Sequence, residues 1–252
     1  LPGLRIAQWF LDPLVKKGPD YEKNKRRIMD KMKYLDCSFL TTSPSALKFL
    51  DSNKNFFIPN PGDPSLEILE NFKKNCINDV FFAMSHGVHR GILKKRYYDE
   101  RTNFVEKLIN NSEKIKFDIY GLNNIQPLWA DNLLNSLSNS KMGLNLSRGK
   151  PTKYYSSDRI TQIIGNGLVT LIDEKTQYRD FFNDKEMVFY NSLSDLTEKI
   201  LKISKDEKLR KQIGRNGKNK YMKYFNSNLV AKFIIEKTFD IKAKNFYWHK
   251  EN

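Results

Sequence analysis

Residues that build metal centres and disulfide frameworks are scarce in this sequence. Its 252 residues include two cysteines, Cys37 and Cys76, and three histidines. No CxxC pair and no Cys/His ligand spacing occurs, so the sequence offers no zinc site of the usual kind. Two isolated thiols in a chain of this size favour a reduced, cytoplasmic protein, although a single disulfide between them stays open.

Long apolar runs are also missing. No segment approaches the roughly 20 apolar residues that a membrane-spanning helix needs, and no signal peptide is visible. We therefore expect a soluble or peripheral protein. The chain opens on Leu1 rather than Met, so an incomplete N-terminal part is one expectation.

Basic residues, by contrast, are abundant. Lys and Arg number 44 against 29 Asp and Glu, which gives a formal net charge of +15. Such a surplus implies an anionic partner: a nucleotide diphosphate, a phospholipid surface, an acidic glycan or a nucleic acid. Much of it is lysine spread through expected helices, which a solvated surface explains equally well. A hydrophobic content of 39% with 13% aromatics excludes a disordered chain.

The most informative stretch runs from Met142 to Asp173. An apolar run to Leu146 is followed by a basic loop to Ser157, isoleucines at helical spacing, a Gly-Asn-Gly stop and a second apolar run. This succession of strand, loop, helix and strand is typical of a parallel α/β sheet. Ligands of such sheets lie where the carboxyl ends of strands meet the starts of helices.

The same alternation of strands and helices extends over most of the chain. Strands are expected at residues 4–11, 37–41, 56–58, 80–84, 115–120, 142–146, 168–172 and 187–190, and helices at 21–33, from 44 onward, 98–110, 132–138, 160–164, 194–203, 207–220 and 228–239. The sequence therefore predicts an α/β protein with parallel sheets.

A cluster of prolines and a glycine from Pro59 to Pro64 is the best candidate for a domain boundary. The alternation of expected strands and helices is interrupted there and resumes after it. We expect an N-terminal parallel-sheet part over residues 1–75, a second parallel-sheet domain over 76–225, and a C-terminal helix over 226–252 that packs back across the domains.

The first candidate site is the loop after the expected strand at 80–84. It contains Ser85, His86, Gly87, Arg90 and Lys94. Glycine permits close approach of the backbone to a phosphate, and the cations neutralise its charge. The loop matches no standard phosphate-binding motif, and a plain surface loop is the alternative.

The second candidate is the central loop and the helix start behind it. Its chemistry-bearing residues are Arg148, Lys153, Tyr154, Ser156, Ser157 and Arg159. Arginine suits a bidentate grip on a phosphate, tyrosine a stacking contact, and Ser156, Ser157 or Asp158 a helix cap with exposed N–H groups for an anion. Asp12, at the tip of the first expected strand, is a candidate base or sugar-hydroxyl acceptor, and equally a turn residue before Pro13.

The segment Arg159–Thr170 has an Arg, two residues, Gln162 and a helix that ends at Gly before a strand. It is followed by an aromatic pair at Phe181, a short strand at 186–190 and a helix with Arg210, Ile213 and Gly217. In this pattern the second half of the chain resembles GT-B nucleotide-sugar glycosyltransferases of the group-1 and spore-maturation (CgeB-like) families, which have a Glu at the position of Gln162. The resemblance is good from about Lys141 onward and thinner before it.

This resemblance implies two Rossmann-like domains in the GT-B arrangement, an acceptor-side N-terminal domain and a donor domain. It also implies that Ser85–Gly91 faces the donor diphosphate, that Tyr120 and Gly121 border the base, and that Arg159 and Gln162 contact phosphate and ribose. A neutral amide at Gln162 still bonds ribose hydroxyls but supplies no carboxylate. Such enzymes generally need no bound metal, so the expected cofactor is none and the nucleotide sugar is a substrate.

The function predicted from the sequence is transfer of a sugar from a nucleotide-diphosphate sugar to a glycan or lipid-linked acceptor, with retention as the family expectation. Asp12 and His86 are the candidate catalytic residues. The basic charge suits peripheral contact with the inner face of a membrane. Two alternatives stay open: a nucleic-acid or polyanion-binding module, which the placement of the cations disfavours, and a non-catalytic glycosyltransferase-like protein.

Overall fold

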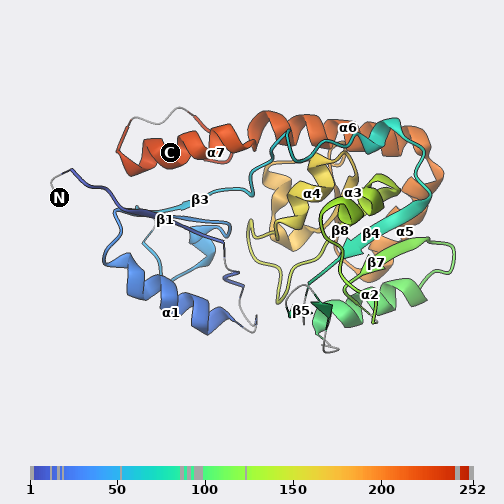
Figure 1. The fold of residues 1–252 in the computed structure, drawn as a ribbon, viewed down its shortest axis with the longest axis horizontal. Coiled ribbons are helices and arrows are strands. Elements are labelled where there is room, and N and C mark those ends of the chain that lie inside the picture. Colours follow the sequence, from blue (N-terminus) through green and yellow to red (C-terminus); the bar gives the residue numbers. More distant parts are fainter. Residues whose placement is uncertain are drawn as a thin grey trace.

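The computed structural model describes residues 3–11, 13–15, 18, 20–51, 53–85, 88–89, 92–93, 99–122, 124–241 and 245–249 (Figure 1). Two parallel sheets lie side by side along the longest axis. The smaller sheet is formed by the N-terminal residues, and the larger one by residues 78–190.

The N-terminal sheet contains β1 (Ala7–Phe10), β2 (Cys37–Leu40) and β3 (Asn55–Phe57), paired in parallel in the order β1-β2-β3. Helix α1 (Tyr21–Met32) connects β1 to β2 and buries Ile28 against Phe10 and Leu40. These elements agree with the expected ones, although β1, α1 and β2 are shorter and β3 begins and ends one residue earlier.

The α-helix expected from Pro44 is wrong. The chain makes only a 3₁₀ turn at Pro44–Ala46, and the hydroxyl of Ser43 contacts that of Ser45 at 2.9 Å instead of capping a helix. Leu47, directly after the turn, is buried in the small core with Phe10 and Leu40. Burial of this leucine therefore ends the turn that the Ser-Pro signal starts.

The larger sheet has five parallel strands in the order β10-β9-β8-β4-β7. Its strands are β4 (Asn78–Ala83), β7 (Phe117–Tyr120), β8 (Ser140–Asn145), β9 (Val169–Asp173) and β10 (Val188–Tyr190), and its helices are α2 (Glu100–Asn110), α3 (Ala130–Ser138), α4 (Arg159–Gly165), α5 (Leu193–Lys205) and α6 (Glu207–Tyr224). The chain starts at β4, adds β7 on one side and then crosses to β8 on the other. The strand order therefore reverses between β4 and β8.

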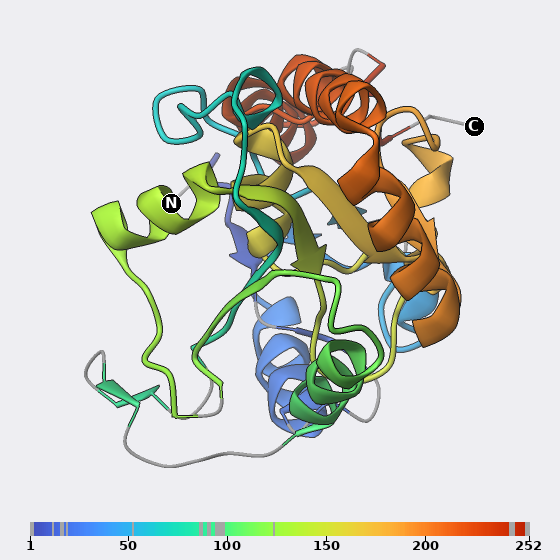
Figure 2. The same ribbon diagram turned by 90° about the vertical axis from the view of Figure 1, so that its right-hand side faces the viewer.

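Helices cover both faces of this sheet (Figure 2). Phe82 on β4 packs with residues of α2 and α5, whereas its neighbour Phe81 points to the opposite face, where Leu137 of α3 and Ile163 of α4 lie. Strands buried on both faces consist of nearly continuous apolar residues, which is why the sequence showed them clearly. Between β4 and α2 the described backbone also forms a short hairpin of β5 (Val88–His89) and β6 (Ile92–Leu93).

Two consecutive helices tie the sheets together (Figure 1). Helix α6 lies along the larger sheet, and α7 (Ser227–Thr238) reaches the smaller one, where Phe233 packs on Phe39 and Phe56. Arg210 of α6 is 1% exposed and donates hydrogen bonds to the carbonyl oxygens of Asn71 at 3.0 Å and Lys74 at 2.7 Å. This arginine therefore anchors the segment between the sheets to α6.

Candidate functional site

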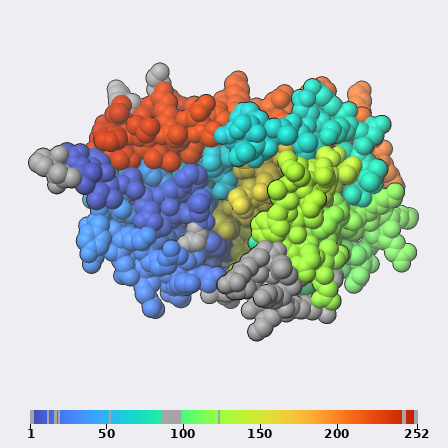
Figure 3. All heavy atoms as spheres, in the orientation of Figure 1, coloured from blue at the N-terminus to red at the C-terminus, as the bar shows by residue number. Residues whose placement is uncertain are grey.

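A pocket of about 350 Å³ opens at the carboxyl end of β4. Its wall includes Ser85 after β4, Trp129 and Leu133 at α3, and Arg159 and Gln162 of α4. Figure 3 shows the surface hollowed between the N-terminal part (blue) and the α3 region (yellow-green), with yellow residues at the floor. The pocket adjoins the β4/β8 reversal, the place where open parallel sheets bind their ligands.

Arg159 holds the two strands together at the reversal point. Its Nε donates to the carbonyl oxygen of Ala83 at 2.8 Å, and its Nη1 donates to that of Leu146 at 3.0 Å and to the hydroxyl of Ser157 at 2.9 Å. Burial, with a smaller contribution from the like charge of Arg101, lowers the pKa of Arg159 to about 10. The guanidinium therefore stays charged at neutral pH, and its Nη2 makes no hydrogen bond to any described residue.

The end of β7 approaches β4 so closely that only glycine fits. Gly121 has φ +73°, and a Cβ atom there would lie 1.7 Å from the carbonyl oxygen of Met84, a residue that lines the pocket. Burial and a hydrogen bond with Asp118 raise the pKa of Tyr120, whose ring packs on Phe81 at 6.4 Å. Gly121 therefore packs against a residue of the pocket lining, whereas Tyr120 is not among the residues that line the pocket.

The central loop lies against the N-terminal part of the chain. Arg148 makes ion pairs with Asp20 at 3.6 Å and Asp99 at 3.8 Å, and the carbonyl oxygen of Lys153 accepts a hydrogen bond from the amide of Ser43 at 3.1 Å. This loop therefore connects the two sheets, a role that its sequence did not indicate.

The other predicted loop residues also have partners within the protein. Tyr154 packs on Phe57 and donates its hydroxyl proton to Asp180 at 2.6 Å. The Ser156 hydroxyl is 2.9 Å from that of Tyr178, in a position where Ser156 is buried. None of Arg148, Lys153, Tyr154, Ser156 and Ser157 lines the pocket at β4, and their contact with a donor stays a prediction.

The expected helix cap is wrong. Asp158 occupies the N-cap position of α4 but makes no capping hydrogen bond with its side chain. The Ser157 hydroxyl instead donates to Oδ1 of Asn145 at 3.2 Å and accepts from Arg159. The arginine therefore draws the serine toward the strand ends and away from the helix amides.

Several predicted residues lie outside the described part of the chain. These are Asp12, His86, Gly87, Arg90 and Lys94. Ser85 is described, is exposed and lines the pocket. Trp129, to which the sequence assigned no role, lines it as well. The sequence could not point to Trp129, because a single tryptophan before a helix belongs to no motif with a characteristic spacing.

Among the described residues, no three His, Cys, Asp or Glu side chains gather where they could hold a metal ion. Both cysteines are buried free thiols, and burial raises the pKa of each. Within the same described residues, none of the helices has the length and apolar character required to span a bilayer.

The sequence matches the glycosyl transferase-like family over residues 100–236, more than half of the chain. The chain therefore belongs to this family. No curated protein matches it in sequence.

The fold is that of GT-B glycosyltransferases, as predicted. The structure is similar to that of TarM from S. aureus, with a TM-score of 0.65 at 13% identity over 94% of this chain and 51% of TarM. HepE from Anabaena in complex with UDP gives 0.65 at 10% identity, covering 92% and 71% of the two chains. Sucrose-phosphate synthase from Thermosynechococcus elongatus gives 0.58 at 14%, covering 91% and 66%. The chain thus spans about half the length of TarM.

Proposed function

We propose that this protein is a glycosyltransferase that binds a nucleotide-diphosphate sugar at the carboxyl end of β4 and transfers its sugar to a glycan or lipid-linked acceptor. The observation that carries the proposal is the pocket in which Arg159, Gln162 and Ser85 meet at the reversal of strand order. An arginine suits the diphosphate, and an amide suits the ribose hydroxyls.

The wall formed by α3 supports a place for the base. Trp129, Leu128 and Leu133 line the same pocket as Arg159 and Gln162 and give it an apolar part. Flat apolar and aromatic surfaces are suited to a base, while polar groups on the other side fix its ribose. Since structures of HepE hold UDP or UDP-glucose and one of TarM holds UDP, we take uridine as the first candidate base.

The finer features follow from the resemblance. We propose transfer without a bound metal, in which cations and backbone N–H groups stabilise the departing diphosphate. We also propose that the transfer retains the configuration of the sugar and that Asp12 and His86 act on the acceptor side. The same proposal includes kinship with the spore-maturation members of the family.

Exposed cations on α1 support an anionic acceptor environment. Lys23, Arg26, Arg27 and Lys33 are all exposed on or directly after this helix, which lies in the N-terminal part. Clustered basic side chains are attracted to anionic lipid surfaces at about 1 kcal/mol each. An acceptor held at a membrane by the N-terminal part fits this arrangement.

The test is thermal unfolding of the full chain with UDP, GDP, ADP and CMP, each with and without EDTA. A nucleotide at 100 times its Kd stabilises the folded state by about 2.7 kcal/mol, or about 5–10 °C for a chain of this size. We expect a selective shift with UDP that EDTA leaves unchanged. No selective shift, together with stabilisation by heparin or DNA, would refute the proposal in favour of polyanion binding.

Gln162 supplies the matching variants. Loss of one hydrogen bond to ribose in Gln162→Ala should weaken UDP binding about three- to tenfold, whereas Gln162→Glu should bind at least as tightly. Gln212→Ala, on an exposed position of α6, is the control. Nucleotide binding without turnover in the wild type, followed by turnover in Gln162→Glu, would identify a non-catalytic relative.

A further inference from the structure

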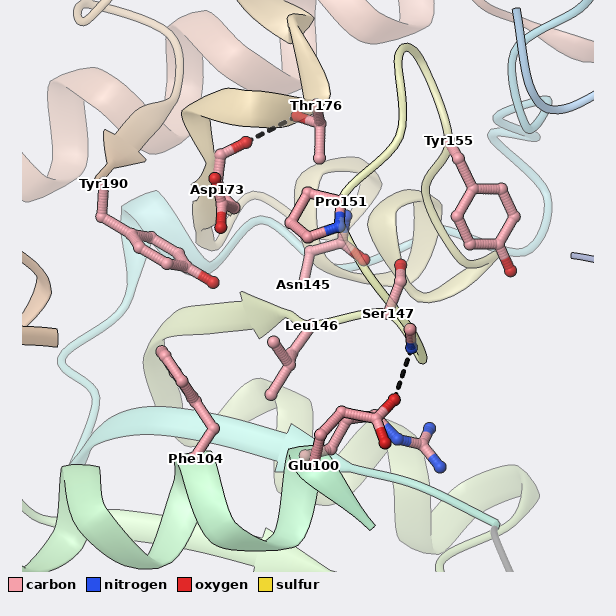
Figure 4. A pocket seen from close by; sticks show the side chains of 12 residues that line it. Glu100, Phe104, Asn145, Leu146, Ser147, Pro151, Tyr155, Asp173, Thr176 and Tyr190 are labelled. Carbon is pink, nitrogen blue, oxygen red and sulfur yellow. Dashed lines mark hydrogen bonds between the residues drawn. The ribbon is translucent and has the colours of Figure 1, made fainter. Parts of the chain in front are cut away.

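A second pocket of about 190 Å³ lies at the carboxyl ends of β8, β9 and β10 (Figure 4). Helix α2 closes it from the opposite side and contributes Phe104 and Glu100. Phe104, Leu146, Pro151 and Tyr155 give it largely apolar walls. The sequence did not single out this pocket, because its residues come from four separate segments.

Tyr190 places an unpaired hydroxyl in this pocket. The residue is 2% exposed, and its oxygen has no hydrogen-bond partner in the part of the chain that the structure describes. Figure 4 shows its ring directed into the space between β9 and α2. Buried polar groups are nearly always paired, so an orphaned hydroxyl facing a cavity indicates a partner that this chain does not itself supply.

Asp173 provides an acceptor beside that hydroxyl. It is the register partner of Tyr190 on the neighbouring strand, so both side chains leave the same face of the sheet. Its Oδ1 accepts from the amide of Lys175 at 2.8 Å, while its Oδ2 has no hydrogen bond from any described residue. One carboxylate oxygen and one phenol therefore flank the same cavity.

The charge of the lining disfavours an anion. The single cation among the lining residues described is Arg101, and it is paired with Asp99 at 2.7 Å. The carboxylate of Glu100 accepts a hydrogen bond from the amide of Gly149, which closes the rim of the pocket. A phosphate or carboxylate would meet two carboxylates and no free cation here.

We propose that this pocket binds a single neutral, hydroxylated ring, such as a monosaccharide or a cyclic polyol. A volume of about 190 Å³ equals roughly six water molecules at ~30 Å³ each, which suits one ring and not a disaccharide. One ring hydroxyl would accept from Tyr190 and donate to Oδ2 of Asp173, while the C–H face of the ring packs on Phe104 and Pro151. The inference goes beyond the nucleotide site and uses none of its residues.

The experiment is titration calorimetry of the full chain with methyl glucoside, N-acetylglucosamine and myo-inositol, with UDP binding measured in parallel. Tyr190→Phe and Asp173→Asn should each weaken the bound ring about tenfold, the effect of one lost hydrogen bond, with unchanged affinity for UDP. Tyr247→Phe is the matched control, because its hydroxyl donates to the carbonyl oxygen of Phe181 at 2.9 Å, away from the pocket.

Competition identifies the source of the ring. Displacement by UDP-glucose but not by UDP would assign the pocket to the donor's sugar, and displacement by neither would assign it to a separate glycan. Either result supports the inference. Failure of every ring to bind, in a protein that binds UDP normally, would overturn it and leave the proposed function intact. Equal weakening by Tyr247→Phe, or preferential binding of inorganic phosphate, would overturn it too.

Discussion

Replacing Arg159 by Met tests the idea that one side chain supports both the fold and the nucleotide pocket. The substitution removes hydrogen bonds to Ala83, Leu146 and Ser157, each worth about 1.5–3 kcal/mol for a charged donor. The substitution also removes an unfavourable contribution, because burial lowers the pKa of Arg159 to about 10, which corresponds to a cost of roughly 3 kcal/mol for burying its charge. The net loss of unfolding free energy should therefore be about 1.5–6 kcal/mol.

Urea unfolding at pH 7 measures this loss, and calorimetry measures UDP affinity in the folded variant. We expect at least tenfold weaker UDP binding in Arg159→Met and partial recovery in Arg159→Lys, which keeps the charge but not the fork of donors. Arg26→Met, at an exposed position of α1, controls for loss of a positive charge. A variant as stable as the wild type with unchanged UDP affinity would refute the reasoning.

Two further predictions concern the strand ends. Gly121→Ala should cost at least about 2 kcal/mol of unfolding free energy and weaken UDP binding, because the left-handed backbone and a Cβ contact of 1.7 Å with the carbonyl oxygen of Met84 both oppose the alanine. The control is Gly3→Ala, because Gly3 has φ +80° but no atom within 4 Å of the position that a Cβ would take, so this variant measures the backbone contribution alone. Equal effects of the two substitutions would contradict the steric argument. Asp173→Asn should be at least as stable as the wild type at pH 7. Burial raises the pKa of Asp173, so the wild type loses stability relative to the variant as pH rises from 3.8 through that raised pKa. Unfolding at pH 3.5 and pH 7 checks this, and a destabilised variant at pH 7 would contradict it.

The sequence predicted the larger sheet well because its inner strands are buried on both faces. Runs such as Val80–Met84 and Leu168–Ile172 have no polar face to obscure them, and the Gly-Asn-Gly stop at residue 165 marks the end of α4 clearly. The prediction of a helix at Pro44 was wrong because it rested on a start signal alone. A start signal is local, whereas the burial of Leu47 that ends the turn depends on α1 and β2.

For the site, the sequence located residues on the strand ends but not the contacts of the central loop. Ser85, Arg159 and Gln162 line one pocket, as their positions after β4 and on α4 suggest. The loop cation Arg148, in contrast, meets Asp20, a partner more than a hundred residues away. Tyr190 was missed altogether, because an orphaned hydroxyl becomes recognisable only when all its possible partners are placed around it.

Arg159 contacts two pockets whose linings differ in their charged residues. It lines the proposed nucleotide pocket, and it donates a hydrogen bond to the carbonyl oxygen of Leu146, which lines the proposed ring pocket. Arg159 and Asp158 both line the first pocket, whereas Glu100, Asp173 and Arg101 line the second, where Arg101 is paired with Asp99. Because Asp99 neutralises Arg101, the second lining is acidic on balance, which suits a neutral sugar ring better than an anionic diphosphate. A bound hydroxylated ring would also account for a half-buried carboxylate and an unpaired phenol that stability alone would not favour.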